Sequence, residues 1–172
     1  IMMNFLKRRA KPSHDAYAVV TGAGSGIGRS FALELTRRNG VVICADVNLD
    51  GARETVALIE QLGGRAYAVH CDVGNADAVR ELSEQAESLL GHPVTLLINN
   101  AGVGLGGKFT DTSLEDWKWC MHVNLWGVIN GCHAFVPGFK KLGRGAIINV
   151  ASAASYTAAP EMSAYNVTKA GV

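Results

Sequence analysis

The chain has 172 residues, 48% of them hydrophobic and 18% charged, and this length fits one compact domain. Sixteen basic and fifteen acidic side chains leave a formal net charge of +1, so no strong field would steer the molecule to nucleic acid or to an anionic membrane. The composition favours a protein that acts on small molecules.

The first fifteen residues are predicted to form a flexible extension with a basic cluster at residues 7–11. The apolar opening, residues 1–6, is shorter than a signal-peptide core, and no apolar run approaches the ~18 residues of a membrane span. We therefore expect a soluble, cytoplasmic protein without stable membrane insertion. The four cysteines show no C-x-x-C spacing, and we expect reduced, structural thiols.

From residue 16 onward, short apolar runs alternate with longer amphipathic stretches, as in βαβ units that feed a parallel sheet. Each short run is almost entirely apolar, as strands covered on both faces must be. Five strands are predicted, over residues 16–21, 41–46, 66–71, 95–99 and 146–150.

Helices are predicted after these strands, over residues 27–39, 49–62, 75–90, 114–139 and from 163 onward. The pair Asn39 and Gly40 is a helix stop, with Gly40 expected in the left-handed conformation. Asn75 is suited to cap the third helix, and Ser113 and Asp116 have the spacing of a capping box. The order predicts an α/β fold with a doubly wound parallel sheet, a Rossmann domain over residues 16–172.

A glycine-rich turn, Thr-Gly-Ala-Gly-Ser-Gly-Ile-Gly at residues 21–28, follows the first predicted strand and leads directly into a helix. Glycines let backbone amides approach a pyrophosphate at the positive end of the helix dipole. The alternative is a glycine-rich turn that binds no ligand. The order of strand, turn and helix makes this alternative less favoured. Dinucleotide binding is therefore predicted for Gly22, Ser25, Gly26, Ile27 and Gly28.

Asp46 ends the second predicted strand eighteen residues after Gly28, near the separation at which an acidic side chain meets the adenosine ribose. Its charge would repel a 2′-phosphate, and Val47 and Asn48 offer no cation, so NAD is favoured over NADP. Asp46 could instead begin the loop before the next helix. NADP stays open because three arginines lie nearby in sequence, Arg29, Arg37 and Arg38.

Tyr165 and Lys169 stand four residues apart in the last predicted helix, so one face carries both groups. An ammonium group stabilises a neighbouring phenolate, which makes Tyr165 a candidate general acid/base. Alone, such a pair is more often a solvated helix face. Ser152 strengthens the prediction because it follows the fifth predicted strand, where its hydroxyl could donate to a substrate oxygen, with Ser155 as a competitor.

Together these residues resemble the single-domain short-chain dehydrogenase/reductase family, over about residues 17–172. The glycine pattern Thr-Gly-x-x-x-Gly-x-Gly is matched at residues 21–28, and Asn-Asn-Ala-Gly is matched at residues 99–102. Ser152, Tyr165 and Lys169 fall on the family's serine, tyrosine and lysine with gaps of thirteen and four.

The resemblance implies further site residues. Asp72 and Val73 look like the adenine-contacting pair, and Asn99, Ala101 and Gly102 would also contact the cofactor. Asn124, in the long helix, resembles a fourth catalytic residue that holds a water beside the lysine in relatives. A helix-kinking amide bonded to a freed carbonyl is the alternative for Asn124, and an amide that ties backbone together is the alternative for Asn99.

The implied activity is hydride transfer between NAD(H) and a secondary alcohol or ketone. Ser152 and Tyr165 would bond the substrate oxygen, and Lys169 would also hold cofactor hydroxyls. Relatives continue past the tyrosine and lysine helix, so we expect this chain to be the front part of a longer enzyme. A homodimer or homotetramer is expected, because the long helix and the catalytic helix form such interfaces in relatives.

The sequence leaves three alternatives to this function. A non-catalytic dinucleotide-binding or scaffold protein could keep the fold, although the intact serine, tyrosine and lysine argue against it. A lyase or epimerase would need other side chains at the sheet edge. No metal site is expected, since the spacing of the nearest candidates fits no usual zinc pattern; these are Cys120, His122, Cys132 and His133.

Overall fold

The computed structural model describes residues 11–172. The first ten residues, with most of the predicted basic cluster, lie outside the described residues. The strands are β1 (Tyr17–Thr21), β2 (Val41–Asp46), β3 (Arg65–His70), β4 (Leu96–Asn99) and β5 (Ala146–Asn149). The helical segments are α1 (Gly26–Arg37), α2 (Leu49–Gln61), α3 (Ala76–Leu90), α4 (Leu114–Met121), η1 (His122–Trp126), α5 (Gly127–Leu142), η2 (Ala153–Ser155) and α6 (Ser163–Gly171).

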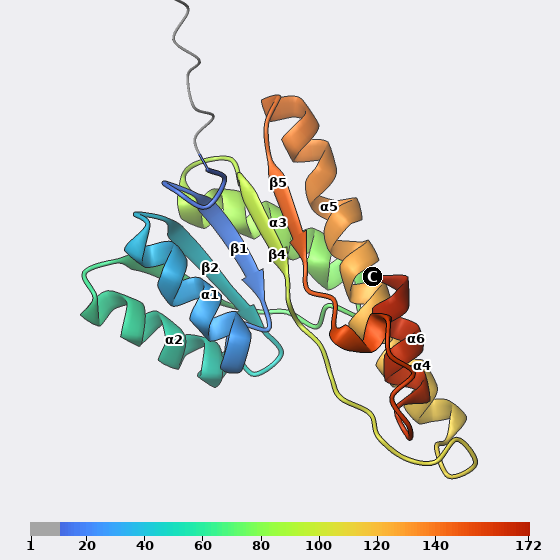
Figure 1. Cartoon of the computed structure of the whole chain (residues 1–172). Coiled ribbons are helices and arrows are strands. Elements are labelled where there is room, and N and C mark those ends of the chain that lie inside the picture. The colour runs from blue at the N-terminus through green and yellow to red at the C-terminus, as the bar shows by residue number, and fades with distance from the viewer. Residues whose placement is uncertain (1–10) are drawn as a thin grey trace, which may run out of the picture.

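The five strands form one parallel sheet in the order β3-β2-β1-β4-β5. Figure 1 labels β2, β1, β4 and β5 of this sheet. The chain moves outward from β1 to β3, then crosses back and continues through β4 to β5. The strand order therefore reverses between β1 and β4, which is the position where doubly wound sheets bind ligands. The predicted doubly wound α/β fold is confirmed.

Each face of the sheet has its own apolar core, because successive side chains of a strand point to opposite faces. Val20 and Ile98 pack with α1 and α2, whereas Val19 and Leu97 pack with α3 and α5. Figure 1 shows α1 and α2 on one face and α3 and α5 on the other. Burial on both faces explains why the strand sequences are nearly all apolar.

The end of α1 differs from the prediction. The helix stops at Arg37, and Asn39 rather than Gly40 takes the left-handed conformation, with φ of 61°. Asparagine tolerates this region better than most residues. Gly40 is needed for another reason: a Cβ there would lie 2.9 Å from the Leu35 carbonyl oxygen.

The long helix predicted over residues 114–139 is divided. The capping box at its start is confirmed, since Ser113 Oγ accepts from the Asp116 amide and the Asp116 carboxylate accepts from the Ser113 amide. After α4, however, residues 122–126 form the π turn η1 before α5 continues. A single continuous α-helix was therefore the wrong prediction for this segment.

Within residues 11–172, no helix is both long and apolar enough to cross a membrane. The same part of the chain contains no group of three His, Cys, Asp or Glu side chains that could hold a metal ion.

Candidate active site

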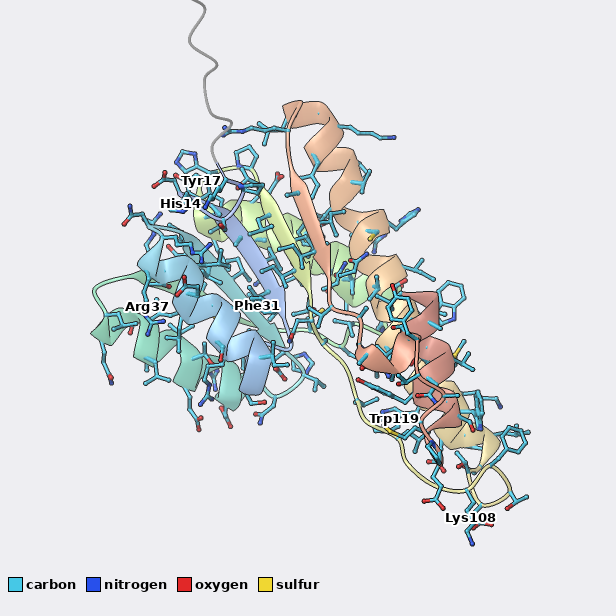
Figure 2. The ribbon with its side chains drawn as sticks, in the orientation of Figure 1. His14, Tyr17, Phe31, Arg37, Lys108 and Trp119 are labelled. Carbon is cyan, nitrogen blue, oxygen red and sulfur yellow. The ribbon has the colours of Figure 1, made fainter. Side chains whose placement is uncertain are left out.

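A cavity of about 880 Å³ lies at the carboxyl ends of the strands, within the size range of small-molecule sites. It is lined by residues that follow every strand of the sheet and by side chains of α4, η1 and α6. We call it the central cavity. At the opposite end of the sheet, Tyr17 stacks on His92 with ring centroids 4.3 Å apart, and Figure 2 labels Tyr17 there.

The glycine turn forms one wall of the central cavity. All five predicted cofactor residues of this turn line the cavity, namely Gly22, Ser25, Gly26, Ile27 and Gly28. The turn is tightly folded, because a Cβ on Gly28 would lie 2.0 Å from the Gly22 carbonyl oxygen. The Ser25 side chain does not cap α1, so the first amides of the helix keep their hydrogen-bonding capacity for a ligand.

Asp46 lines the same cavity and holds the turn in place. One carboxylate oxygen accepts from the Gly24 amide at 2.7 Å, and the other accepts from the Asn48 amide at 2.8 Å. The two interpretations offered by the sequence are thus compatible, because each oxygen keeps a lone pair for a ligand hydroxyl.

The three nearby arginines are occupied by other partners. Arg29 donates to Thr55 Oγ1 at 2.9 Å and pairs with Glu54 at 2.9 Å. Arg37 and Arg38 both pair with Glu34, and these two ion pairs lower the pKa of the Glu34 carboxyl. None of the three arginines lines the central cavity.

The residues after β3 and β4 form the cavity floor. Asp72, Val73, Ala101 and Gly102 all line it, as predicted. Asn99 does not: its side chain is 3% exposed and donates to Asn149 Oδ1 of β5 at 2.9 Å. The structure therefore favours the alternative offered for Asn99, an amide that ties neighbouring strands together.

The next residue, Asn100, lies at the cavity instead. It lines the cavity, and its Nδ2 donates to the carbonyl oxygens of Thr21 and Gly22 at 3.0 and 3.3 Å. These bonds tie the end of β4 to the glycine turn.

Ser152 and Ser155 have different surroundings. Ser152 lines the cavity, and its Oγ accepts from the Ala154 amide at 3.2 Å, which leaves the hydroxyl proton free to donate. Ser155 Oγ donates to the Lys169 carbonyl oxygen at 2.7 Å and does not line the cavity. Its hydroxyl is a structural contact between η2 and α6.

Tyr165 and Lys169 both line the cavity from one face of α6. The Lys169 Nζ lies 5.9 Å from the centroid of the Tyr165 ring and donates to the Val150 carbonyl oxygen at 2.8 Å. Lys169 is 6% exposed, and burial lowers the pKa of its ammonium group, an effect that the Cys120 thiol partly opposes.

Asn124 lies in the π turn and is fully buried below the cavity floor. Its side chain bonds both backbone groups of Val103, accepting from N at 2.7 Å and donating to O at 2.9 Å. A Cβ on Gly102 would lie 3.2 Å from Asn124 Oδ1 and 3.5 Å from Lys169 Nζ, so glycine leaves room between the amide and the ammonium.

Several lining residues lay outside the sequence predictions. Val103, Trp119, His122 and Met162 face the cavity from loops and helices without a recognisable motif. Trp119 is half-exposed, and Figure 2 labels it at the end of the molecule that α4 and α6 form. For Trp119, the signal that the sequence offered for a place in the site was an aromatic side chain in a predicted amphipathic helix.

All four cysteines are free thiols. Burial raises the pKa of Cys44 to about 12, and burial together with the charge of Asp72 raises the pKa of Cys71 to about 11. Both therefore remain protonated at neutral pH and are unsuited to act as nucleophiles.

The cavity fits a dinucleotide in two respects. Uncapped amides at the start of α1 suit a pyrophosphate, and the Asp46 carboxylate at the end of β2 suits ribose hydroxyls. Ile27 and Val47 are also 64% and 66% exposed at its rim, so a flat apolar ligand could cover them.

Comparison with known proteins identifies a family of dehydrogenases. A family model described as short chain dehydrogenase matches residues 16–172. Probable oxidoreductase EphD of Mycobacterium tuberculosis is 40% identical over 157 residues, which cover 91% of this chain and 26% of that protein. The 7alpha-hydroxysteroid dehydrogenase of Escherichia coli is 34% identical over 153 residues, which cover 89% of this chain and 59% of that enzyme.

Solved structures share the fold. A short chain dehydrogenase/reductase from Burkholderia phymatum in complex with NAD superposes with a TM-score of 0.89 and 36% identity, covering 94% of this chain and 57% of that one. An alcohol dehydrogenase from Thermococcus sibiricus complexed with 5-hydroxy-NADP superposes with a TM-score of 0.84 and 29% identity, covering 90% of this chain and 65% of that one. This chain thus spans 57% to 65% of the length of these two structures. The match over residues 16–172 and the shared fold establish that the chain belongs to the short-chain dehydrogenase/reductase family.

Proposed function

We propose that the whole protein is an oxidoreductase that transfers a hydride between NAD(H) and a secondary alcohol or ketone. The observation that carries this proposal is the central cavity, which places Ser152, Tyr165 and Lys169 in one space with the glycine turn and Asp46. The names of the steroid dehydrogenase and the alcohol dehydrogenase among the relatives support the same substrate class.

In this proposal, Tyr165 is the general acid/base. During alcohol oxidation its phenolate oxygen takes the hydroxyl proton of the substrate while the carbon-bound hydrogen leaves with its electron pair, and ketone reduction reverses both transfers. The nicotinamide of the bound dinucleotide supplies the hydride acceptor or donor. Lys169 stabilises the phenolate through its nearby positive charge, and Ser152 donates a hydrogen bond to the substrate oxygen.

Asn124 acts from below in this scheme. Its amide bonds Val103 of the loop after β4 and Thr168 of the catalytic helix, and so connects the two. The Lys169 ammonium donates one of its three protons to the Val150 carbonyl oxygen, and the other two are suited to hold ribose hydroxyls.

NAD is the proposed cofactor in preference to NADP. The Asp46 carboxylate lines the cavity at the end of β2, which suits it to bind the adenosine ribose and to repel a 2′-phosphate. The engagement of Arg29, Arg37 and Arg38 with acidic partners leaves no arginine of this group to compensate that repulsion.

The oligomeric state and compartment are also proposals. Trp126, Ile129 and Val167 are 49%, 42% and 50% exposed on η1, α5 and α6, which supports a homodimer or homotetramer in which these helices are covered. Four free thiols support a reducing compartment such as the cytoplasm. Light scattering coupled to size exclusion, on the protein at its full natural length, tests the first of these proposals.

The proposed activity is tested with purified full-length protein, first by fluorescence titration with NADH and NADPH. Turnover of NAD is then measured with a panel of secondary alcohols that runs from cyclohexanol to hydroxysteroids. Tyr165→Phe is the matched variant, since it removes one oxygen from the cavity.

We expect saturable binding that favours NADH, and turnover that Tyr165→Phe reduces by about 10²- to 10⁴-fold without loss of NADH binding. Binding without turnover of any alcohol would instead support the non-catalytic dinucleotide-binding protein. Failure to bind either nucleotide would overturn the cofactor assignment.

A further inference from the structure

We infer that Thr168 is a positioning residue for the reaction proposed above, on which this inference rests. Its buried hydroxyl joins the catalytic helix α6 to the π turn η1 and, through Asn124, to the loop that forms the cavity floor. Thr168 does not line the central cavity and therefore acts through other residues.

The hydroxyl of Thr168 uses both of its hydrogen-bonding functions. Oγ1 donates to the Tyr165 carbonyl oxygen at 2.8 Å and accepts from Asn124 Nδ2 at 3.2 Å. The side chain is 0% exposed, so water cannot replace either partner. Leaving a buried polar group without a partner is costly, so the Thr168 hydroxyl is held in the orientation that keeps both hydrogen bonds.

The second partner, Asn124, reaches the cavity floor. Its Oδ1 and Nδ2 bond the amide and carbonyl of Val103, the residue that follows Ala101 and Gly102 in the floor. One Nδ2 proton goes to the Val103 carbonyl at 2.9 Å, which leaves the other for Thr168 and for the weak acceptor Cys120 Sγ at 3.3 Å. A continuous chain of hydrogen bonds thus runs from the floor to the backbone of Tyr165.

The other side-chain bonds of α6 lead in a different direction. Ser155 Oγ bonds the Lys169 carbonyl, Asn166 Nδ2 bonds the Ala159 carbonyl, and Lys169 Nζ bonds the Val150 carbonyl. All three tie α6 to the segment after β5. Among the described side-chain hydrogen bonds, the bond from Asn124 to Thr168 is the one that ties α6 to η1.

The location of Thr168 within α6 explains why this tie would affect the chemistry. The residue lies between Tyr165 and Lys169, and it bonds the carbonyl of the first and directly precedes the second. Loosening this turn of helix would move the phenol and the ammonium relative to the floor on which the cofactor would lie. A displacement of about 1 Å is enough to reduce catalysis by two orders of magnitude.

The chain offers a matched control in Thr36. This threonine is also buried in a helix, and its Oγ1 donates to the Ala32 carbonyl at 3.0 Å, but within residues 11–172 no side chain donates to it. Thr36→Val therefore measures the cost of replacing a buried, helix-bonded hydroxyl by a methyl group far from the cavity.

The test uses full-length protein with NAD and whichever secondary alcohol the wild type turns over. Thr168→Val, Thr168→Ser and Thr36→Val are compared by kcat, KM, NADH dissociation constant and melting temperature. We expect Thr168→Val to lower kcat by about tenfold to a hundredfold with little change in NADH binding. Thr168→Ser, which keeps the hydroxyl, should recover most of that loss.

The melting temperature separates positioning from mere stabilisation. Thr168→Val and Thr36→Val each lose one buried hydroxyl, so both should melt at a lower temperature than the wild type, whereas only Thr168→Val should lose kcat. Thr36→Val should leave kcat unchanged.

Each outcome decides the question. If Thr168→Val loses no more activity than Thr36→Val, or if Thr168→Ser fails to recover it, the inference is overturned. If Thr168→Val does not fold, the smaller Thr168→Ala replaces it, and equal kcat for Thr168→Ala and Thr168→Ser would overturn the inference. A wild type that turns over no alcohol would overturn the proposed function itself, whereas an active wild type with unaffected variants would overturn the role of Thr168 alone.

Discussion

The nucleotide-binding region and the catalytic region of this chain are built by different means. In the first, central strands are buried on both faces, with Val19, Val20 and Ile43 all at 0% exposure. In the second, β5 forms an edge of the sheet, Ile148 is 41% exposed, and Tyr156 in the loop before α6 is 95% exposed.

The difference shows what holds each set of site residues. The glycine turn and Asp46 project from a close-packed apolar core, and hydrogen bonds from Asn100 and to Asp46 hold the turn against it. Ser152 and Lys169 depend on a few hydrogen bonds, chiefly those made by Val150, Ser155 and Thr168. Substitutions of cavity-lining residues in the first region should therefore change nucleotide binding, whereas those in the second should reduce turnover while binding persists.

The largest effect is expected from Gly28→Ala. The new methyl group would lie 2.0 Å from the Gly22 carbonyl oxygen and 2.6 Å from Asn100 Nδ2, so the turn must open. We expect loss of measurable NADH binding in a fluorescence titration, together with a lower melting temperature.

Gly138→Ala is the control for this variant. Its methyl group would meet only Glu87 Oε1 at 3.6 Å, an ordinary contact, and alanine favours α5 by about 0.5–1 kcal/mol. Normal NADH binding by Gly28→Ala would contradict a glycine turn shaped by close packing.

The next largest effect distinguishes two serines of the catalytic region, Ser152 and Ser155. Ser152→Ala should lower kcat by about 10²- to 10³-fold, as when one donor to a developing oxyanion is removed, with NADH binding unchanged. Ser155→Ala should instead lower the free energy of unfolding by about 1 kcal/mol, since it loses one hydrogen bond to the backbone of α6. Steady-state kinetics and thermal melts distinguish the two, and a reversed pattern would exchange the roles of these serines.

A smaller effect is expected for Asp46→Asn. The amide keeps an oxygen to accept from the Gly24 amide but removes the charge that opposes a 2′-phosphate. The ratio of the NADPH and NADH dissociation constants should shift toward NADPH by about tenfold, the change expected when a charged hydrogen-bond partner becomes neutral. An unchanged ratio would mean that Asp46 serves the loop alone.

The smallest effect concerns stability. Burial lowers the pKa of Lys169 in the folded protein below its ordinary value of 10.5. At a pH between these two pKa values, Lys169 therefore takes up a proton when the protein unfolds. The stability of the wild type consequently rises with pH across that range. Lys169→Met removes this buried charge and should melt about 2–4 °C higher near pH 7. The advantage should shrink as the pH approaches 10.5, and an advantage independent of pH would show that the charge is not its source.

The sequence was sufficient to predict the sheet and most of the cavity, because both depend on local patterns. The predicted bounds of β2 agree with the structure at both ends, since an apolar run between a helix stop and an acidic residue has one plausible register. The turn before α1 and the spacing from Ser152 to Lys169 likewise fix residues by position along the chain.

What the sequence could not predict depends on contacts across the fold. Asn99 and Asn100 are adjacent, and only the side chain's surroundings show that Asn100 faces the cavity while Asn99 pairs with Asn149. Trp119 and Met162 lie in segments without a motif. The role of Thr168 required a partner 44 residues away.

The π turn at residues 122–126 has a consequence for comparing this helix with others. A π turn contains one residue more than an α-helical turn, so it acts as a single-residue insertion within a helix. After this turn, Gly127 packs against Val73 and Gly131 packs against Asn99. In an uninterrupted α-helix, the residues at these two contacts would be shifted by one position along the sequence. A sequence alignment with a helix that lacks the turn should therefore contain a one-residue gap within 122–126, and deletion of one residue there would create a regular helix at the expense of the buried place of Asn124.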